Sequence, residues 1–306
     1  MNLSVVIAAR NEAAEITDCF KSVEKLADEI ILVDNESTDD TAKVAHNFGA
    51  KVYTHKNDPL HLNLSKNFGF TKAKESWILS LDADERVSPE LAKDIIQITQ
   101  GEALRTQGLP LKTAAYQFPR QNIIFGRWIQ HGLWYPDEQI RLFKKSRAQF
   151  PGVHNHEKLQ VDGDIGQLSG HLIHYNYRTV SQYIKKINDV YSDNEVEISL
   201  NAGKTVTWPD AIRMPTSDFL TNFFAREGYK DGLHGLVLAL LQAFYTFVVF
   251  AKIWEKQNFP AYNSDQWLSQ VTREFKSKTQ EYNYWYNRHG SSCLYRLIKY
   301  LRVPKA

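Results

Sequence analysis

The chain has few cysteines, and it lacks the glycine-rich loops that mark many nucleotide-binding folds. Its 306 residues include only Cys19 and Cys293, too few for a disulfide scaffold or a cysteine-built zinc site. The loop after the first strand-like run reads AARNEAAE, without the glycines of a dinucleotide-binding fingerprint, and the sequence contains no Walker loop. A phosphate site in this chain therefore needs another source of positive charge, such as a divalent cation.

Charge is balanced overall but unevenly distributed. The net charge is +2, yet from Lys276 onward seven lysines and arginines accompany a single acid, Glu281. This basic tail indicates contact with an anionic surface, while the balanced body leads us to expect no nucleic-acid partner. The apolar residues 3–9 are cut short by Arg10, so we expect no signal peptide and a reducing, cytosolic compartment.

Strand-like and helix-like segments alternate through the first hundred residues. Asn11 is expected to cap the first helix, a further helix is expected near 62–74, and Ser88-Pro89 is a typical helix start. This alternation predicts an α/β fold with a mostly parallel sheet flanked by helices, and ligands bind beyond the carboxyl ends of such strands. The four strand-like runs are 3–8, 29–33, 51–53 and 77–81.

Polar clusters follow three of these strands, and carboxylates dominate them. Asp34 ends the second run, and Asp82 and Asp84 follow the fourth. Two acids so close together repel each other unless positive charge lies between them, and Mg²⁺ or Mn²⁺ accepts such hard oxygen ligands. A bare D-x-D motif is most often a solvated loop. Its place between a buried strand and a capped helix, with Asp34 on a neighbouring strand, favours a metal–nucleotide site.

Several motifs together resemble the inverting family 2 glycosyltransferases, which have the GT-A fold, a Rossmann-like mixed sheet flanked by helices. The resemblance continues into the branch that contains lipopolysaccharide-core heptose β-1,4-glucosyltransferases. It covers roughly residues 1–190 and becomes fainter to about residue 255. The motifs are VVIAARNEAAEI, IILVDNESTDDT, LSKNFGF, WILSLDADE, GRWIQHGLWYPDEQIRLFKK and HEKLQVDGDIGQLSGHLIHYNYRTVSQYIKK.

This resemblance implies roles for individual residues in binding a UDP-sugar donor. Asp34 would recognise the base, Lys66 would supply positive charge near the nucleotide, and Asp84 would bind the cation. Asp82 would form the metal motif together with Asp84, or contact the ribose or a metal-bound water. The residues implied to line the nucleotide pocket from the first loop are Arg10, Asn11 and Glu12.

The acceptor side needs a carboxylate that takes the proton of the attacking hydroxyl. Asp137, which follows Pro136 as in the family pattern, is the preferred base, and Glu138 is the alternative. Arg141 is expected either to steer phosphate or to pair with an acid. His156 matches a family histidine and is a candidate metal ligand or acceptor contact, whereas packing and function are equally expected for His174.

The C-terminal third is predicted to be helical and to associate with membranes. Residues 235–251 are apolar except for Gln242 and Thr246, a length at the lower limit for a spanning helix. They suit an interfacial helix or a core helix as well. A basic amphipathic stripe over 294–302 adds membrane character. We therefore expect a glycosyltransferase domain over 1–190 and a helical, membrane-associating region over 191–306.

These observations predict a metal-dependent inverting transferase that moves a hexose, expected to be glucose, from a UDP-sugar to a glycan or lipid-linked acceptor. Lipopolysaccharide core is the expected context, with the enzyme peripheral on the inner face of the cytoplasmic membrane. Two alternatives stay open: a sugar-1-phosphate nucleotidyltransferase, whose glycine-rich basic loop is missing here, and a non-catalytic nucleotide-binding scaffold. The sequence sets neither the linkage nor the oligomeric state.

Overall fold

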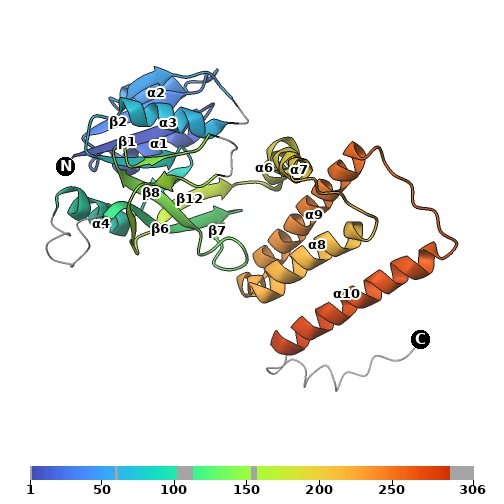
Figure 1. Cartoon of the computed structure of the whole chain (residues 1–306). Coiled ribbons are helices and arrows are strands. Elements are labelled where there is room, and N and C mark those ends of the chain that lie inside the picture. The colour runs from blue at the N-terminus through green and yellow to red at the C-terminus, as the bar shows by residue number, and fades with distance from the viewer. Residues whose placement is uncertain (1, 59–60, 102–112, 153–156, 290–306) are drawn as a thin grey trace. The chain divides into compact units, whose positions relative to one another are not determined.

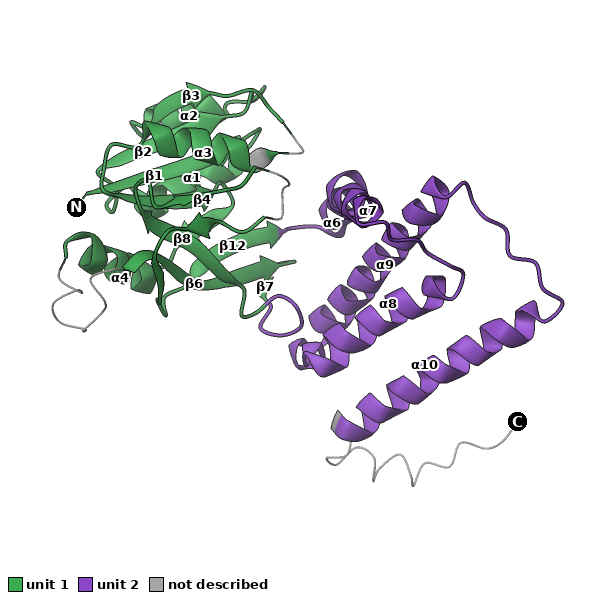
Figure 2. Ribbon diagram, viewed as in Figure 1, with its two compact units in different colours: residues 1–128, 135–176 green, residues 129–134, 177–306 purple. Residues whose placement is uncertain are grey.

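The chain forms two compact units (Figures 1 and 2). The computed structural model describes residues 2–58, 61–101, 113–152 and 157–289. Unit 1 comprises residues 1–128 and 135–176, and unit 2 comprises residues 129–134 and 177–306. The domain boundary expected at residue 190 lies inside unit 2, within a π-helical segment, η1 (Ile187–Tyr191).

Unit 1 is built on a mixed sheet. Its strand order is β3-β2-β1-β4-β8-β6-β12-β5, with β7 and β11 also paired to β6. Strands β1 to β4 are parallel, whereas β8 is antiparallel to β4 and β6 is antiparallel to β8. The strands are β1 Leu3–Ala9, β2 Glu29–Asp34, β3 Lys51–Thr54, β4 Trp77–Asp82, β5 Glu85–Val87, β6 Thr113–Ile124, β7 Arg127–Trp128, β8 Glu138–Lys144, β11 Asp164–Gln167 and β12 Leu172–Tyr177. A separate ribbon pairs β9 Ala148–Gln149 with β10 Gln160–Val161.

Helices cover both faces of this sheet because the central strands are apolar on both sides. One face packs against α1 (Ala13–Val23), α2 (Thr41–Asn47) and α4 (Pro89–Thr99). The other face packs against α3 (Leu62–Lys72) and the segment around β9 and β10. Strands buried on both faces read as continuous β-branched runs, which is the pattern of β1 and β2. The α/β class expected from the sequence is confirmed.

Gly69 lets α3 lie directly on the sheet. A Cβ atom at this position would lie 2.5 Å from Val6 Cγ1 and 2.8 Å from Val33 Cγ2. Both distances are too short for carbon atoms, so only glycine fits without displacing β1 or β2. The close approach fixes the position of Lys66, which is on the same helix.

Local sequence signals explain most element ends. Ser88 caps α4, with its Oγ accepting a hydrogen bond from Leu91 N at 3.2 Å, and α2 ends just before Gly49, whose φ is +71°. The expected cap at Asn11 is wrong. The N-cap of α1 is Glu12, without a side-chain cap bond, because Asn11 takes a left-handed conformation and turns its amide to the next loop.

Unit 2 is helical, as expected. Thr179 caps its first helix by accepting a hydrogen bond from Gln182 N. Helix α9 packs against α8 and α7 through a small core of Val196, Val206, Val249, Phe250 and Ile253. The helices are α6 Val180–Lys186, α7 Ser192–Asn201, α8 Asp210–Leu220, a second π-helical segment η2 Thr221–Ala225, a 3₁₀ turn η3 Gly228–Asp231, α9 Leu233–Lys256 and α10 Trp267–His289.

Candidate active site

The carboxyl ends of β2, β1 and β4 lie level with one another. Asp34 is paired in register with Ala9, and Asp82 with Ala8, so the two acids stand on the strands that flank β1. The chain order reverses here, since β2 and β3 continue to one side of β1 and β4 lies on the other. In open α/β sheets such a switch point is where ligands bind. The sequence predicted that acids from separate strands lie at one end of the sheet, and the strand register confirms this for Asp34 and Asp82.

The first two loops are tied together above this end of the sheet. Asn11 Oδ1 accepts a hydrogen bond from Thr38 N at 2.7 Å, and Asn11 N donates to Ser37 Oγ at 2.9 Å. Glu12 N donates to Thr41 Oγ1 at 2.8 Å. Arg10, at the end of β1, is exposed to solvent. The three polar residues of the first loop therefore lie beside the loop that follows Asp34.

Asp34 carries an unused acceptor. The residue is only 7% exposed, and its Oδ2 accepts a long hydrogen bond of 3.3 Å from Ser37 N. Its Oδ1 is buried and has no hydrogen-bond partner in the part of the chain that the structure describes. A buried carboxylate oxygen without a donor is unfavourable, so this atom is suited to receive an N–H group from a ligand.

Asp82 is neutralised by the protein itself. Its Oδ1 lies 2.6 Å from Lys66 Nζ, and its Oδ2 lies 2.6 Å from Arg141 Nη2. Burial would raise the pKa of Asp82, but the two cations outweigh it and hold the pKa well below its ordinary value. At Asp82, Lys66 and Arg141 supply positive charge of the kind expected beside the D-x-D motif.

Arg141 reaches Asp82 because β8 has a bulge. Tyr116 and Gln117 are consecutive on β6, yet they pair with Leu142 and Ile140, so Arg141 is an extra residue on β8. A bulge redirects the side chain of the extra residue. Arg141 Nη2 also donates to Glu85 Oε1 at 2.8 Å. Of the two roles expected for Arg141, the structure shows the pairing with acids.

Glu85 joins this cluster from β5. It is fully buried, accepts a hydrogen bond from Asp82 N at 2.9 Å through Oε2, and receives Arg120 Nη1 at 3.3 Å on Oε1. A buried carboxylate needs such complete pairing to remain charged. Glu85 therefore connects the D-x-D turn to Arg120 on β6.

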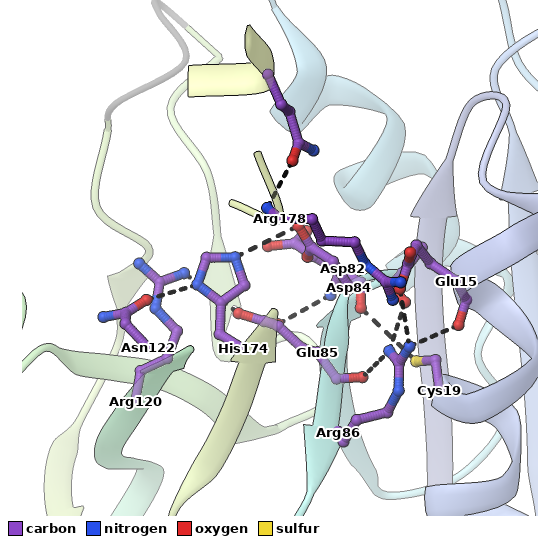
Figure 3. Close-up of polar contacts among 12 residues, drawn as sticks. Glu15, Cys19, Asp82, Asp84, Glu85, Arg86, Arg120, Asn122, His174 and Arg178 are labelled. Carbon is purple, nitrogen blue, oxygen red and sulfur yellow. Dashed lines mark hydrogen bonds and ion pairs between the residues drawn. The ribbon is translucent and has the colours of Figure 1, made fainter. Parts of the chain in front are cut away.

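A second chain of contacts runs from Asp84 through His174 and Asn122 to Asp137, and Figure 3 shows its part from Asp84 to Asn122. His174 Nε2 lies 3.4 Å from Asp84 Oδ2, and His174 Nδ1 lies 2.7 Å from Asn122 Oδ1. Asn122 Nδ2 then donates to Asp137 Oδ2 at 3.0 Å. Because an amide oxygen only accepts, His174 carries a proton on Nδ1. The preferred metal residue and the preferred base are thus linked through two buried side chains.

Asp137 is held firmly. Arg120 Nε and Nη2 both lie 2.7 Å from Asp137 Oδ2, and Gln139 Nε2 donates to Oδ1 at 2.7 Å. Burial would raise the pKa of Asp137, but Arg120 and the hydrogen bonds from Asn122 and Gln139 lower it below its ordinary value. Within the described part of the chain, Oδ1 receives one donor, Gln139 Nε2, and keeps a lone pair for a further hydrogen bond.

Glu138 faces the opposite way. It is exposed, and its Oε2 accepts a hydrogen bond from Gln167 Nε2 at 3.0 Å. Successive residues of a strand point to opposite faces. Glu138 therefore lies on the face away from Asn122 and Arg120.

Asp84 and His174 fit a divalent cation. Nδ1 of His174 is engaged by Asn122 and Nε2 faces Asp84 Oδ2, which is the arrangement that supporting hydrogen bonds give metal-binding histidines. Among the described residues no three His, Cys, Asp or Glu side chains gather into a metal site. A pair of protein ligands is nevertheless sufficient for Mg²⁺-type ions, which take their remaining ligands from phosphates and water.

Sequence reasoning located Asp34, Lys66, Asp82, Asp84 and Asp137 and left His174 undecided. It missed Glu85, Arg120 and Asn122, because single polar residues on strands carry no motif. Burial along residues 113–124 does not alternate, and these contacts follow only from the strand register. His156, expected as a ligand, lies outside the described residues.

Comparisons with known proteins agree on one family. The sequence model of glycosyl transferase family 2 matches residues 4–104. An uncharacterized glycosyltransferase of Rickettsia typhi is 33% identical over 267 residues, covering 83% of this chain and 87% of that protein. The lipopolysaccharide core biosynthesis glycosyltransferase LpsC of Rhizobium meliloti is 26% identical over 276 residues, covering 85% and 94%. The crystal structure of S. aureus TarS 1–349 in complex with UDP-GlcNAc has a TM-score of 0.46 at 13% identity, covering 86% and 93%.

Proposed function

Because the chain belongs to glycosyltransferase family 2, we propose that it transfers a hexose, glucose in the first instance, from a UDP-sugar to a glycan acceptor with inversion at the anomeric carbon. The observation that carries this proposal is the contact chain Asp84–His174–Asn122–Asp137 at the carboxyl end of β4. It joins a candidate metal pair to a candidate base. Family membership also disfavours the nucleotidyltransferase and the non-catalytic scaffold.

Donor binding is assigned to the end of the parallel strands. Asp34 Oδ1, buried and without a partner among the described residues, would accept the ring N–H of uracil. The exposed Arg10, with Asn11 and Glu12, would line the nucleotide pocket. Asp82 is occupied by Lys66 and Arg141, so we assign it to hold these cations in place rather than to bind metal.

The divalent cation would be held by Asp84 and His174, and when bound it would neutralise the negative charge of the departing diphosphate. Lys66 adds fixed positive charge close by. His174 keeps its orientation through the hydrogen bond to Asn122. We propose Asp84 and His174 as the protein ligands in place of the pair Asp84 and Asp82.

Asp137 would remove the acceptor proton. The acceptor oxygen forms a bond to the anomeric carbon, the bond from that carbon to the diphosphate oxygen breaks, and the proton passes to Asp137 Oδ1. Arg120 and Asn122 hold Oδ2, which leaves Oδ1 as the reacting oxygen. The orientation of Glu138 toward Gln167 favours Asp137 over Glu138.

The acceptor is proposed to be an inner-core region of lipopolysaccharide or a related lipid-linked glycan. The relative from Rhizobium meliloti, named for lipopolysaccharide core biosynthesis, supports this class. Such acceptors are assembled on lipid, so we place the enzyme in the cytoplasm, peripheral on the inner face of the membrane.

The test is a panel of UDP-sugars incubated with the full-length chain and a core acceptor, with and without Mn²⁺. We expect UDP release and a product heavier by one hexose, only with metal. Asp84→Ala should abolish transfer, and Asp137→Asn should lower kcat by about 10²–10⁴-fold. The matched control Glu138→Gln should stay within about threefold of the parent. Full turnover by Asp84→Ala, or a larger loss in Glu138→Gln than in Asp137→Asn, would overturn these assignments.

A further inference from the structure

Helix α9 carries an apolar stripe on its exposed side. The five side chains of this stripe are 36–72% exposed, although all are large and apolar. Their positions follow a spacing of three, four or seven residues, which places them along one line of a helix. The apolar stripe consists of Leu233, Leu240, Phe244, Phe247 and Trp254.

The part of the stripe from Leu240 to Phe247 lies in a segment without charged residues. Residues 235–251 contain no Asp, Glu, Lys or Arg. Among the described residues, α9 is the helix that is long and apolar enough to cross a membrane. Its most apolar window of 18 residues has a mean hydropathy of 2.0, and 28% of that window is buried. A solvent-exposed apolar surface of this kind marks an interaction site.

The other side of α9 packs against the rest of unit 2. Thr246 Oγ1 donates to Asp218 Oδ2 at 2.9 Å, and Lys252 Nζ lies 2.7 Å from both Asp193 Oδ1 and the Asn188 carbonyl oxygen. Val249 and Phe250 are in the core that α9 shares with α7. If α9 crossed a bilayer, these polar groups would have to enter hydrocarbon or lose their partners, which is unfavourable.

Charge and aromatic content indicate which surface covers the stripe. The stripe ends at Trp254, whose ring centroid lies 4.9 Å from that of Phe259, and tryptophan is favoured at the membrane interface. Helix α10 exposes Arg273, Lys276 and Arg288. The sequence from Lys276 onward has seven basic residues and one acid. Apolar side chains combined with basic ones are the two signals that together give stable binding to an anionic bilayer.

We propose that unit 2 binds an anionic lipid bilayer with the apolar stripe lying in the plane of the headgroup boundary, while α9 does not cross the membrane. This lipid-binding proposal rests on the proposed function and extends it, because it states how the enzyme reaches a lipid-linked acceptor. Lipid binding itself is measured without any sugar, so it stands or falls separately from transfer.

The first experiment measures co-sedimentation of the full-length chain with vesicles of phosphatidylglycerol and phosphatidylcholine. We expect Phe244→Asn to lower the partition coefficient by at least about threefold and Phe244→Asn with Phe247→Asn by at least about tenfold. The matched control is Ile165→Asn, at a 46% exposed apolar position of unit 1, which should bind as the parent does. Transfer to a delipidated acceptor should be unchanged in all variants, which shows that they are folded.

A second experiment separates lying on the bilayer from crossing it. Protein bound to the vesicles should be released by alkaline carbonate and should bind weakly to pure phosphatidylcholine. Retention through carbonate extraction would show a spanning helix and overturn the proposal. So would parent-like vesicle binding by the double variant. A chain that ignores vesicles but sediments as a dimer, which Phe244→Asn dissociates, would assign the stripe to a second copy instead.

Discussion

Asn122 offers the sharpest test of the proposed site, because it touches both halves of it. Its Oδ1 accepts from His174 Nδ1 at 2.7 Å, and its Nδ2 donates to Asp137 Oδ2 at 3.0 Å. The side chain is fully buried, so no water replaces either bond in a shortened variant. Asn122→Ala removes both bonds, whereas Asn122→Asp keeps an acceptor for His174 and loses the donor to Asp137.

The magnitude follows from the two bonds. The bond to the charged Asp137 contributes about 1.5–3 kcal/mol and the bond to His174 about 0.5–1.5 kcal/mol. Asn122→Ala should therefore lower the free energy of unfolding by about 2–4 kcal/mol. Loss of the supporting bond to a metal-binding histidine typically weakens metal affinity or activity by about 10–100-fold. We therefore expect Asn122→Ala to weaken Mn²⁺ binding in the presence of UDP and to lower kcat, each by that factor.

Asn122→Asp separates the two effects. Mn²⁺ affinity, measured by calorimetry with UDP present, should stay within about threefold of the parent, since His174 keeps its partner. The value of kcat should still fall by about 10-fold or more, because the base loses a donor and gains a neighbouring carboxylate. The control is Gln167→Ala, which removes the hydrogen bonds of Gln167 with Glu138, Gln117 and the Leu168 carbonyl and touches neither His174 nor Asp137.

One result would refute this reasoning. If Asn122→Ala is folded by circular dichroism and binds Mn²⁺ with the parent's affinity, His174 is not a metal ligand held by Asn122. Transfer at the parent's rate in the same variant would remove Asn122 from the positioning of Asp137 as well.

Three further predictions concern the fold around the site and the helical unit. Arg141→Met should lower the free energy of unfolding by about 3–5 kcal/mol in urea titrations, because Asp82 and the fully buried Glu85 lose their shared cation; an unchanged midpoint would contradict it. Gly69→Ala should destabilise by about 1–3 kcal/mol, since its Cβ would meet Val6 and Val33, unless the gain in helix propensity offsets the clash. Burial raises the pKa of Asp218, so its charged form is disfavoured in the folded state above the unfolded pKa of about 3.9. Asp218→Asn should therefore raise Tm at pH 8 by about 1–3 °C. The gain is small because solvent screens this half-buried group. It should vanish as the pH falls below about 4, where Asp218 is protonated in both the folded and the unfolded chain.

The sequence was sufficient for the parts of the fold that depend on short-range pattern. Continuous apolar runs predicted β1, β2 and β4, and Ser88-Pro89 predicted the start of α4. The GT-A class and the helical C-terminal region are confirmed by the structure and by the family match. The strands and helix starts follow from periodicity and capping, which act over a few residues, whereas the GT-A class was implied by the resemblance of the motifs.

The site could be predicted only in part, because its connections are long-range. Arg141 and Asp82 are 59 residues apart, and His174 and Asn122 are 52 apart, so their pairing depends on strand order and on the bulge in β8. The prediction of a cap at Asn11 was wrong for the same reason. Asn11 serves the loop after β2 rather than its own helix, and a tertiary contact overrides a local preference.

The charges around the D-x-D turn show how two neighbouring acids take different roles. Asp82 and Asp84 differ by one residue, yet Asp82 has both oxygens in ion pairs with Lys66 and Arg141, whereas Asp84 faces a histidine. A carboxylate already neutralised by two cations has little affinity left for a third, while Asp84 gains from one. This difference is our reason for proposing Asp84, rather than Asp82, as the metal ligand. Asp137 directly precedes the same strand, β8 Glu138–Lys144, so the proposed base and the cation that neutralises Asp82 come from one short segment.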